Sequence, residues 1–437
     1  MMTELKKYRR DTRSSVRLLF LKMFSAENVA NFSLVLIFPL LFIYQFLIAQ
    51  FPDHIEPIFG SGWAITIAIL FFWLAYFFVK KFFLQKNQLL LLDYLFVSFL
   101  FLIVLVSLLN YFGPFNAQYA FHLLYWNLSG VASNATCYMA FRLAKLDKPH
   151  YLKIWVGFAF LSILSVVSNM TVMRGFYFVD PNFYFGFERL EHVWSYQGFA
   201  RSLLITFFMG VFAVQNSIVS VFFYVVGTLA LIANLSRTEL ILFVVGVPAI
   251  IFILGSNKVK QKILLILAMT ISFAVLGLVF LPDMLDFLKI FSHTRAASLL
   301  DLPNDQSFQL RVGQSLVALR EIFDSPFFGN YGKYYLGTGR PGSYNHDIFL
   351  VWVNMGLVGF VLYCSILGLL IKYLFTTKLF KADRVQTYIA GVLGGCAIVA
   401  HTFSYTYVDI MLACAVGAVA NLHSARRILD PKVMSMD

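Results

Sequence analysis

The sequence predicts an all-α polytopic membrane protein with about twelve transmembrane helices and a large exterior (periplasmic) loop between the ninth and the tenth. Three observations support this: 60% of the 437 residues are hydrophobic, only 13% are charged, and apolar runs of about 20 residues recur along the chain. One globular core cannot bury so much apolar surface. The bilayer is therefore the expected solvent for most of the chain.

The individual spans follow from the apolar runs and from the polar residues that separate them. The sixth and seventh spans are divided only by Gln215, Asn216 and Ser217, and merging them would move every later loop to the other side of the membrane. The predicted spans are 31–50, 63–79, 89–109, 119–141, 152–172, 201–215, 217–235, 239–255, 263–281, 347–371, 386–404 and 408–424.

The distribution of positive charge gives the expected orientation of these spans. Most of the 34 Lys and Arg residues fall in segments that a twelve-span count, with both termini inside, assigns to the cytoplasm. The short outer loops 51–62 and 110–118 contain no Lys or Arg, whereas the inner loops read KKFFLQK, SNKVKQK and KLFKADR. The net charge of +12 is thus explained by topology, and no nucleic-acid partner is expected.

The chain divides into a short N-terminal segment and one membrane domain. Residues 1–24 form a basic amphipathic segment, which we expect to lie on the cytoplasmic face of the lipid bilayer, with protein binding as the alternative. No small-residue cleavage site follows it, so the first span is expected to stay in the mature protein. Residues 25–437 show no internal repeat. Their four cysteines lie in apolar runs, where we expect packing rather than disulfides or zinc binding.

Two exterior loops, residues 173–200 and 282–346, are long enough to form a functional site. In the larger loop, residues 307–323 have helical periodicity, and the pattern ends at Ser325-Pro326. Five glycines follow and allow the backbone to approach a ligand closely: Gly329, Gly332, Gly337, Gly339 and Gly342. The tenth span begins directly after this stretch, and the free N–H groups of its first turn favour an anion there.

Arginines gather at the predicted exterior edge, against the positive-inside trend: Arg189, Arg201, Arg237, Arg311 and, in the glycine-rich stretch, Arg340. A single arginine at a span end can extend to water without any function. A set on one side is better explained by a bound anion, because planar guanidinium groups match phosphate oxygens. We therefore expect a clamp for a phosphate or diphosphate, and we expect Glu239 to pair with Arg237 or to cap its helix.

His346 is the first choice for proton transfer. Imidazole titrates near neutrality, and this histidine lies beside Asp347 where a loop enters the membrane. The alternative is a histidine that only caps the helix. Glu188, Glu191 and His192 in the smaller loop are rival bases. No histidine or carboxylate spacing matches a known ligand set, so no metal is expected.

The order and placement of these residues resemble the O-antigen polymerase and O-antigen ligase superfamily, which consists of bacterial integral membrane glycosyltransferases. Ser236-Arg237-Thr238 resembles the SRT element of that family. Residues 311–332 (RVGQSLVALREIFDSPFFGNYG) resemble its run of arginine, helix, Pro and Gly-x-Gly, with one residue more between the last two glycines. Arg189-Leu190, followed by residues 197–200, resembles a weaker version of its arginine segment before the sixth span.

The start of the tenth span carries a further part of the resemblance. His346, followed by Gly356 and Gly359, resembles the family's His-Asn element with its downstream GxxG. The order here is Asn345-His346, and alignment on Gly356 puts Asn345 where the family has histidine. One residue on a helix turns a side chain by about 100°. The general base is therefore either His346 or a residue of the loop 173–200.

The resemblance implies transfer of a glycan from an undecaprenyl-diphosphate-linked oligosaccharide to a sugar hydroxyl, without metal or cofactor, at the outer face of the bacterial inner membrane. This reaction needs positive charge on the leaving diphosphate, for which Arg189, Arg237 and Arg311, with Arg340 of the glycine-rich stretch, are the candidates, and it needs a base for the acceptor hydroxyl, for which His346 is the first choice. We favour a polymerase of surface polysaccharide, with a chain-length regulator protein as a further partner, because the chain adds no extra domain. A ligase that transfers glycan to lipid A-core is the alternative.

A transporter or flippase for polysaccharide or lipid-linked oligosaccharide is the alternative from another class, since twelve spans with both ends inside is a common carrier layout. Ion-coupled carriers usually place ionisable residues in the middle of spans. The predicted spans contain almost none there, which favours the enzyme.

Overall fold

The structure is a computed structural model, and it describes residues 25–40, 62–84, 89–113, 117–147, 151–157, 159–161, 196–213, 217–233, 237–254, 306–333, 347–376 and 385–429. The basic segment 1–24, the predicted span 263–281 and most of the two predicted exterior loops lie outside the described residues.

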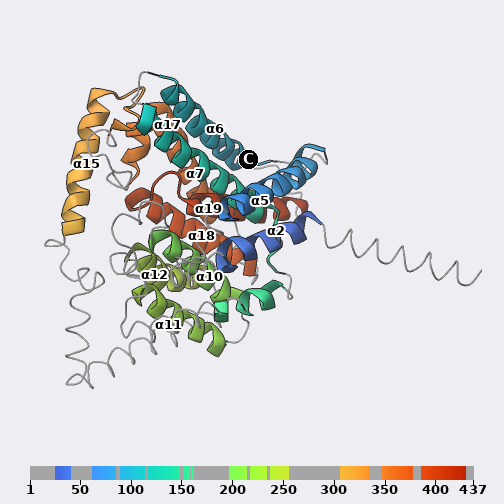
Figure 1. The fold of residues 1–437 in the computed structure, drawn as a ribbon. Helices are drawn as coiled ribbons and strands as arrows, with labels where there is room; N and C mark the ends of the chain where they lie inside the picture. The colour runs from blue at the N-terminus through green and yellow to red at the C-terminus, as the bar shows by residue number, and fades with distance from the viewer. Residues whose placement is uncertain are drawn as a thin grey trace, which may run out of the picture.

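Every regular element in the described ranges is helical (Figure 1). In chain order the labelled elements are α2 (Ala26–Val35), the π-helical turn η1 (Leu36–Leu40), α5 (Gly62–Val79), the π-helical turn η2 (Lys80–Leu84), α6 (Leu91–Tyr111), α7 (Ala117–Leu143), α10 (Tyr196–Ala213), α11 (Ser217–Ala233), α12 (Arg237–Leu254), α15 (Gln306–Asp324), α17 (Phe349–Thr376), α18 (Val385–Phe403) and α19 (Ile410–Leu429). Four helices in these ranges are long and apolar enough to cross a membrane: Thr66–Phe83, Leu91–Tyr111, Phe349–Phe375 and Val385–Phe403. The structure thus has the apolar helices that a membrane protein requires.

Most predicted span boundaries agree with the helices. The spans predicted for α5, α6, α7, α11, α12 and α18 begin and end within two residues of the observed helices. The helices of the first and sixth predicted spans, 31–50 and 201–215, begin five residues earlier than predicted, at Ala26 and Tyr196. Ser25 caps α2, and its side chain accepts a hydrogen bond from the Asn28 amide at 3.4 Å. A hydropathy pattern does not detect such a polar cap.

The break between the sixth and seventh predicted spans is present. α10 ends at Ala213 and α11 begins at Ser217. The two helices form an antiparallel hairpin, in which Ser220 Oγ donates to the Val211 carbonyl at 2.8 Å. Gly227 of α11 faces Phe207 of α10, where a Cβ would lie 3.0 Å from the phenylalanine ring. Close packing at this glycine keeps the two helices together.

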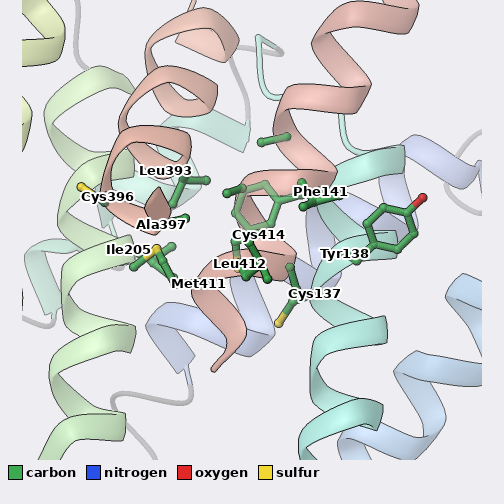
Figure 2. Packing of buried hydrophobic residues seen from close by; sticks show 14 of the residues in the cluster. Cys137, Tyr138, Phe141, Ile205, Leu393, Cys396, Ala397, Met411, Leu412 and Cys414 are labelled. Atoms are coloured by element: carbon green, nitrogen blue, oxygen red, sulfur yellow. The ribbon is translucent and has the colours of Figure 1, made fainter. Parts of the chain in front are cut away.

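α18 and α19 lie at the centre of the bundle, with α6, α7 and α17 on one side and α10 and α12 on the other (Figure 1). α19 approaches α7 closely because it presents glycine there: a Cβ at Gly417 would lie 2.5 Å from the Tyr138 carbonyl oxygen. Figure 2 shows Cys137, Cys396 and Cys414 within this core, all three as free thiols. The prediction that these cysteines are packing residues is confirmed.

A buried ion pair joins helix ends at one end of the bundle. The Nε and Nη2 atoms of Arg142, on α7, donate to the two carboxylate oxygens of Asp93, at the start of α6, each at 3.1 Å. The Tyr138 hydroxyl donates to the same carboxylate at 2.7 Å, and Arg142 also donates to Ser424 of α19 at 2.8 Å. We call Asp93, Tyr138, Arg142 and Ser424 the Arg142 cluster. Sequence analysis did not predict it.

α17 is broken at Gly356. This residue has φ +65° and ψ −166°, a backbone conformation that only glycine adopts readily. The rings of Trp352 and Phe360 on either side of it are stacked, with centroids 4.4 Å apart. Eight residues of an unbroken helix would separate them by about 12 Å along the axis. The helix therefore bends sharply here, a feature that the predicted straight span 347–371 does not contain.

The two arms of α17, residues 349–355 and 357–376, lie beside each other. The Ile348 amide, next to the first arm, donates to the Thr402 carbonyl at 3.4 Å. The Tyr363 hydroxyl, on the second arm, lies 2.6 Å from Nδ1 of His401. Their partners are consecutive residues of α18, whereas positions 348 and 363 would be about 22 Å apart along a straight helix. The first arm thus folds back along the second.

Candidate functional site

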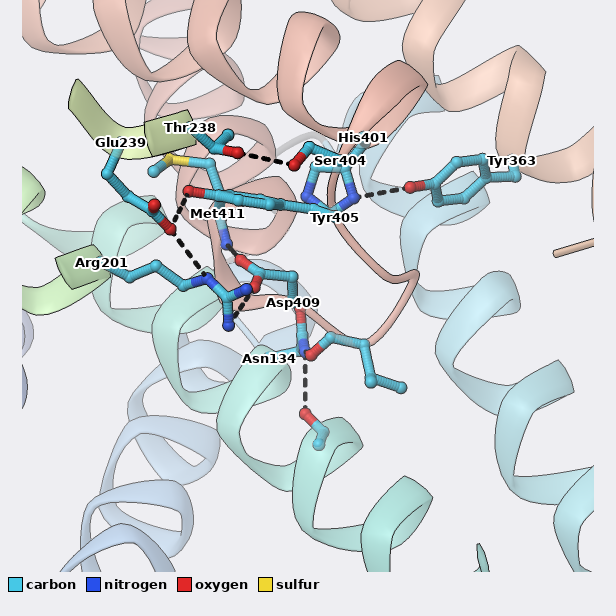
Figure 3. A network of polar contacts seen from close by, with 12 residues as sticks. Asn134, Arg201, Thr238, Glu239, Tyr363, His401, Ser404, Tyr405, Asp409 and Met411 are labelled. Carbon is cyan, nitrogen blue, oxygen red and sulfur yellow. Dashed lines mark hydrogen bonds and ion pairs between the residues drawn. The ribbon is translucent and has the colours of Figure 1, made fainter. Parts of the chain in front are cut away.

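The turn between α18 and α19, residues 404–409, is fixed from two sides. Asp409 caps α19, since its Oδ1 accepts a hydrogen bond from the Met411 amide at 3.0 Å. Asn134 of α7 donates from Nδ2 to the Val408 carbonyl at 2.6 Å. The turn therefore presents its polar side chains from fixed positions toward the starts of α10 and α12 (Figure 3).

Arg201 of α10 meets two carboxylates at this turn. Its Nη1 lies 2.6 Å from Asp409 Oδ2, and its Nε lies 3.6 Å from Glu239 Oε1, on α12. The guanidinium also stacks over the Tyr405 ring, with its carbon 4.5 Å from the ring centroid. Three segments that are distant in sequence thus meet at one cation (Figure 3). The charge of Arg201 is matched within the protein, unlike that of an arginine that awaits an anionic ligand.

Tyr405 supports Glu239 from the other side. Its hydroxyl donates to Glu239 Oε1 at 2.7 Å, and burial raises the pKa of this hydroxyl well above its ordinary value. Tyr405 therefore stays protonated and remains a donor. The sequence assigned Glu239 to Arg237 or to a helix cap. Its partners here include Arg201 and Tyr405, while the Arg237 side chain lies outside the described residues.

Ser404 brings together two residues of the sequence motifs. Its hydroxyl lies 2.7 Å from Thr238 Oγ1, at the start of α12, and accepts a hydrogen bond from Arg311 Nη1, on α15, at 3.3 Å. Thr238 belongs to the predicted Ser-Arg-Thr element, and Arg311 opens the predicted arginine and helix run. We call the seven residues around this turn the polar cluster: Arg201, Thr238, Glu239, Arg311, Ser404, Tyr405 and Asp409.

The start of α17 is anchored to α15, one turn of helix from Arg311. Asp347 caps α17, because its Oδ1 accepts from the Phe349 amide at 2.8 Å. Its Oδ2 accepts a hydrogen bond from Ser315 at 2.8 Å. Asp347 therefore joins the start of α17 to the helix that carries Arg311.

The turn after α15 docks on the break in α17. The Leu357 amide, freed by the break, donates to the carbonyls of Pro326 at 3.0 Å and Phe327 at 3.2 Å. A Cβ at Gly356 would overlap the Phe327 carbonyl, and a Cβ at Gly329 would lie 2.5 Å from the Val353 carbonyl. Gly329 and Gly356, which the resemblance placed in two separate motifs, are thus both needed where the backbone after α15 contacts the backbone of α17.

Tyr331 fixes the same turn to the bundle. Its side chain is buried, and its hydroxyl donates to Ser107 of α6 at 3.0 Å and accepts from Asn127 of α7 at 2.5 Å. The Gly332 amide donates to Asn354 Oδ1 at 3.1 Å. Gly329 and Gly332 both have φ +71°. The segment Gly329 to Gly332 has one residue more than a Gly-x-Gly motif. The turn is longer by that residue, and its Tyr331 side chain inserts between α6 and α7.

The structure brings together part of the predicted site. Arg311 and Thr238 meet at Ser404. The proposed base, its three rivals and two proposed diphosphate ligands lie outside the described residues: His346, Glu188, Glu191, His192, Arg189 and Arg340. Within the described ranges, no group of three or more His, Cys, Asp or Glu side chains is placed to hold a metal ion.

Sequence reasoning missed Ser404, Tyr405 and Asp409. Their signal was present, since residues 404–409, where the last two predicted spans meet, are unusually polar and read SYTYVD. Comparison of the sequence with models of known protein families and with characterised proteins gave no significant match. Function therefore has to be argued from the geometry and chemistry of the site.

Proposed function

We propose that the chain is a surface polysaccharide (O-antigen) polymerase of the bacterial inner membrane. In this proposal twelve spans cross the membrane, both termini are cytoplasmic, and the loop 282–346 is periplasmic. The enzyme transfers a growing glycan from undecaprenyl diphosphate to a lipid-linked repeat unit at the outer face of the membrane.

The contact of Arg311 with Thr238 through Ser404 is the observation that carries this proposal. Arg311 on α15 thus meets the Ser-Arg-Thr element at the start of α12. Arg237 directly precedes Thr238 in that element. Arg311 and Arg201 supply two positive charges, and Glu239 and Asp409 supply two negative charges. These four charges balance one another. In the proposal, a diphosphate is the anion that the further arginines Arg237, Arg189 and Arg340 bind.

In the proposed reaction a hydroxyl oxygen of the acceptor sugar attacks the anomeric carbon of the donor. The bond from that carbon to the diphosphate oxygen breaks, the electron pair leaves with undecaprenyl diphosphate, and the hydroxyl proton passes to a base. Arg237 and Arg311, with Arg189 and Arg340, stabilise the charge that develops on the leaving group. His346 is the proposed base.

The direct test is deletion of the gene in its host, followed by gel analysis of the surface polysaccharide. Loss of the ladder above one repeat, with the one-repeat core retained, is the expected result for a polymerase. Loss of all core-attached glycan, with lipid-linked polymer retained, would identify a ligase instead. An unchanged ladder would exclude both reactions.

The base is tested by substitution at the start of the tenth span. His346→Ala should lose at least about a hundredfold in transfer rate, as expected when a general base is removed. Asn345→Ala should cost much less, because an amide is no base. A near wild-type rate for His346→Ala, together with loss of transfer in Glu188→Gln, Glu191→Gln or His192→Ala, would move the base to the smaller loop.

A further inference from the structure

α15 uses one face to pack on the first arm of α17. Ala318 and Ile322 are buried against Val353, with Phe349 and Trp352 beside them. Ala318 and Ile322 lie on the same face of α15 as Arg311 and Ser315, which make the polar contacts described above. This face of α15 is therefore fully used within the chain.

A second apolar stripe on α15 is exposed in the part of the chain that the structure describes. Val312, Leu316 and Phe323 are spaced by four and seven residues, which aligns them on one side of a helix, next to the packed face. All three are exposed, Phe323 to 82%. Arg320 and Asp324, also exposed, fall in the next sector around the helix. α15 thus has one face on α17, one exposed apolar stripe and a third sector in which the exposed Val317 lies beside Arg320 and Asp324.

α15 lies alongside the apolar helices and not beyond their ends. Near its start, Arg311 contacts Ser404, directly after α18. Further along, Ala318 and Ile322 pack on the first arm of α17, and after the helix ends Phe327 accepts a hydrogen bond from Leu357, the first residue of the second arm. Figure 1 shows α15 at the edge of the bundle. The exposed stripe is therefore at the level of helices that are built to cross a membrane.

The stripe continues into the outer surface of α17. Phe327 and Phe328 follow α15 and are exposed, Phe328 to 90%. The Phe327 carbonyl binds the amide of Leu357, the residue before Val358. Val358 and Val361 are exposed apolar residues on the second arm of α17. In a membrane-crossing helix such residues face lipid.

We propose that α15, within the loop 282–346 on the periplasmic side, enters the outer edge of the bilayer beside α17 and that its stripe of Val312, Leu316 and Phe323 is covered by the acyl chains of membrane lipids. The sector of Arg320 and Asp324 faces water or headgroups. The helix itself is not among those apolar enough to cross the membrane, so it has the composition of an amphipathic helix that lies at the side of the bundle. The proposal requires the chain to be a membrane protein but does not depend on the reaction proposed above.

The experiment is site-directed spin labelling of the full chain in liposomes. Each labelled variant carries one cysteine, at Leu316, Phe323 or Arg320, in a background where the four native cysteines are replaced by alanine. Power saturation compares collisions of the label with oxygen, which concentrates in the acyl region, and with a water-soluble nickel chelate. Arg320→Cys is the matched control, one helical turn from Leu316→Cys, where the stripe borders the sector of Arg320 and Asp324.

We expect oxygen collisions to dominate at Leu316→Cys and Phe323→Cys, and nickel collisions to dominate at Arg320→Cys. Dominant nickel collisions at both stripe positions would show that the stripe faces water and would overturn the proposal. Protection of both stripe positions from oxygen and nickel alike would show that protein covers them, either another segment of the chain or a second copy, and would equally overturn it. The three labelled positions are exposed, whereas Cys137, Cys396 and Cys414 are buried, so the cysteine-free background is first compared with the native chain by thermal unfolding.

Discussion

Arg142 and Arg201 are both held by carboxylates between helix ends, yet their surroundings differ. Arg142 meets one carboxylate in a two-bond geometry, and both side chains are 1% exposed. Arg201 is shared between two carboxylates, one of them at 3.6 Å, and 20% of its side chain is exposed. A buried ion pair whose two charges neutralise each other is suited to holding helices together. The shared and partly open cation joins the starts of α10, α12 and α19 at the place where Arg311 of α15 also makes contact.

The largest effect is expected at the Arg142 cluster. Arg142→Ala leaves the Asp93 carboxylate buried without its cation, which should reduce the free energy of unfolding by about 3 to 5 kcal/mol. Thermal unfolding in detergent measures this. Lys145→Ala is the matched control, because Lys145 is exposed near the same helix end. Equal stability of the two variants would contradict the comparison.

Gly356→Ala should cost at least about 2 kcal/mol of stability, since a side chain at positive φ would also overlap the Phe327 carbonyl. The matched control is Gly368→Ala on the same helix, where a Cβ meets nothing within 4 Å. Alanine there should be neutral or slightly stabilising. Thermal unfolding of both variants is the measurement, and equal melting temperatures would show that the turn after α15 does not dock on the break.

Replacement of Arg311 tests whether the polar cluster acts through geometry as well as charge. Arg311→Lys keeps the charge but loses the planar guanidinium, so we expect activity to fall about tenfold while the protein remains in the membrane. Arg320→Lys, on the exposed side of α15, should retain full activity. Transfer of lipid-linked repeats by membrane preparations is the assay. Full activity in both Arg311→Lys and Arg237→Lys would remove the diphosphate clamp.

The smallest effect is expected at Ser404. Ser404→Ala removes the link between Thr238 and Arg311, and a lost hydrogen bond of about 1 kcal/mol corresponds to roughly a fivefold fall in activity. Ser365→Ala is the control, because its hydroxyl donates to the carbonyl of Val361 on its own helix. The same activity assay applies, and a Ser404→Ala enzyme as active as the control would place the link outside the reaction.

Sequence reasoning was reliable where local patterns determine structure. Apolar runs located α6 and α7, and periodicity located α15, because burial and helix geometry are properties of neighbouring residues. It failed where partners are distant. The pairing of Asp93 with Arg142 and the sharing of Arg201 between Glu239 and Asp409 depend on how the helices pack, which no single segment encodes.

The site shows the same division. Arg311 and Thr238 were identified as motif residues, but their meeting point, Ser404, was not. The role of Gly356 was also hidden, since a glycine in an apolar run reads as an ordinary part of a membrane helix. The positive φ and the approach of the Phe327 carbonyl, which together explain the need for glycine, are visible only in the structure.

The break in α17 also has a consequence for how far the chain reaches. From Leu357 to Phe375, the second arm rises about 28 Å at 1.5 Å per residue. This nearly equals the hydrocarbon thickness of a bilayer, about 30 Å. The seven residues before Gly356 are thus not needed for crossing, although hydropathy counts them in the span. They instead form a short helix on which α15 packs, and so they determine the depth of α15 relative to the membrane.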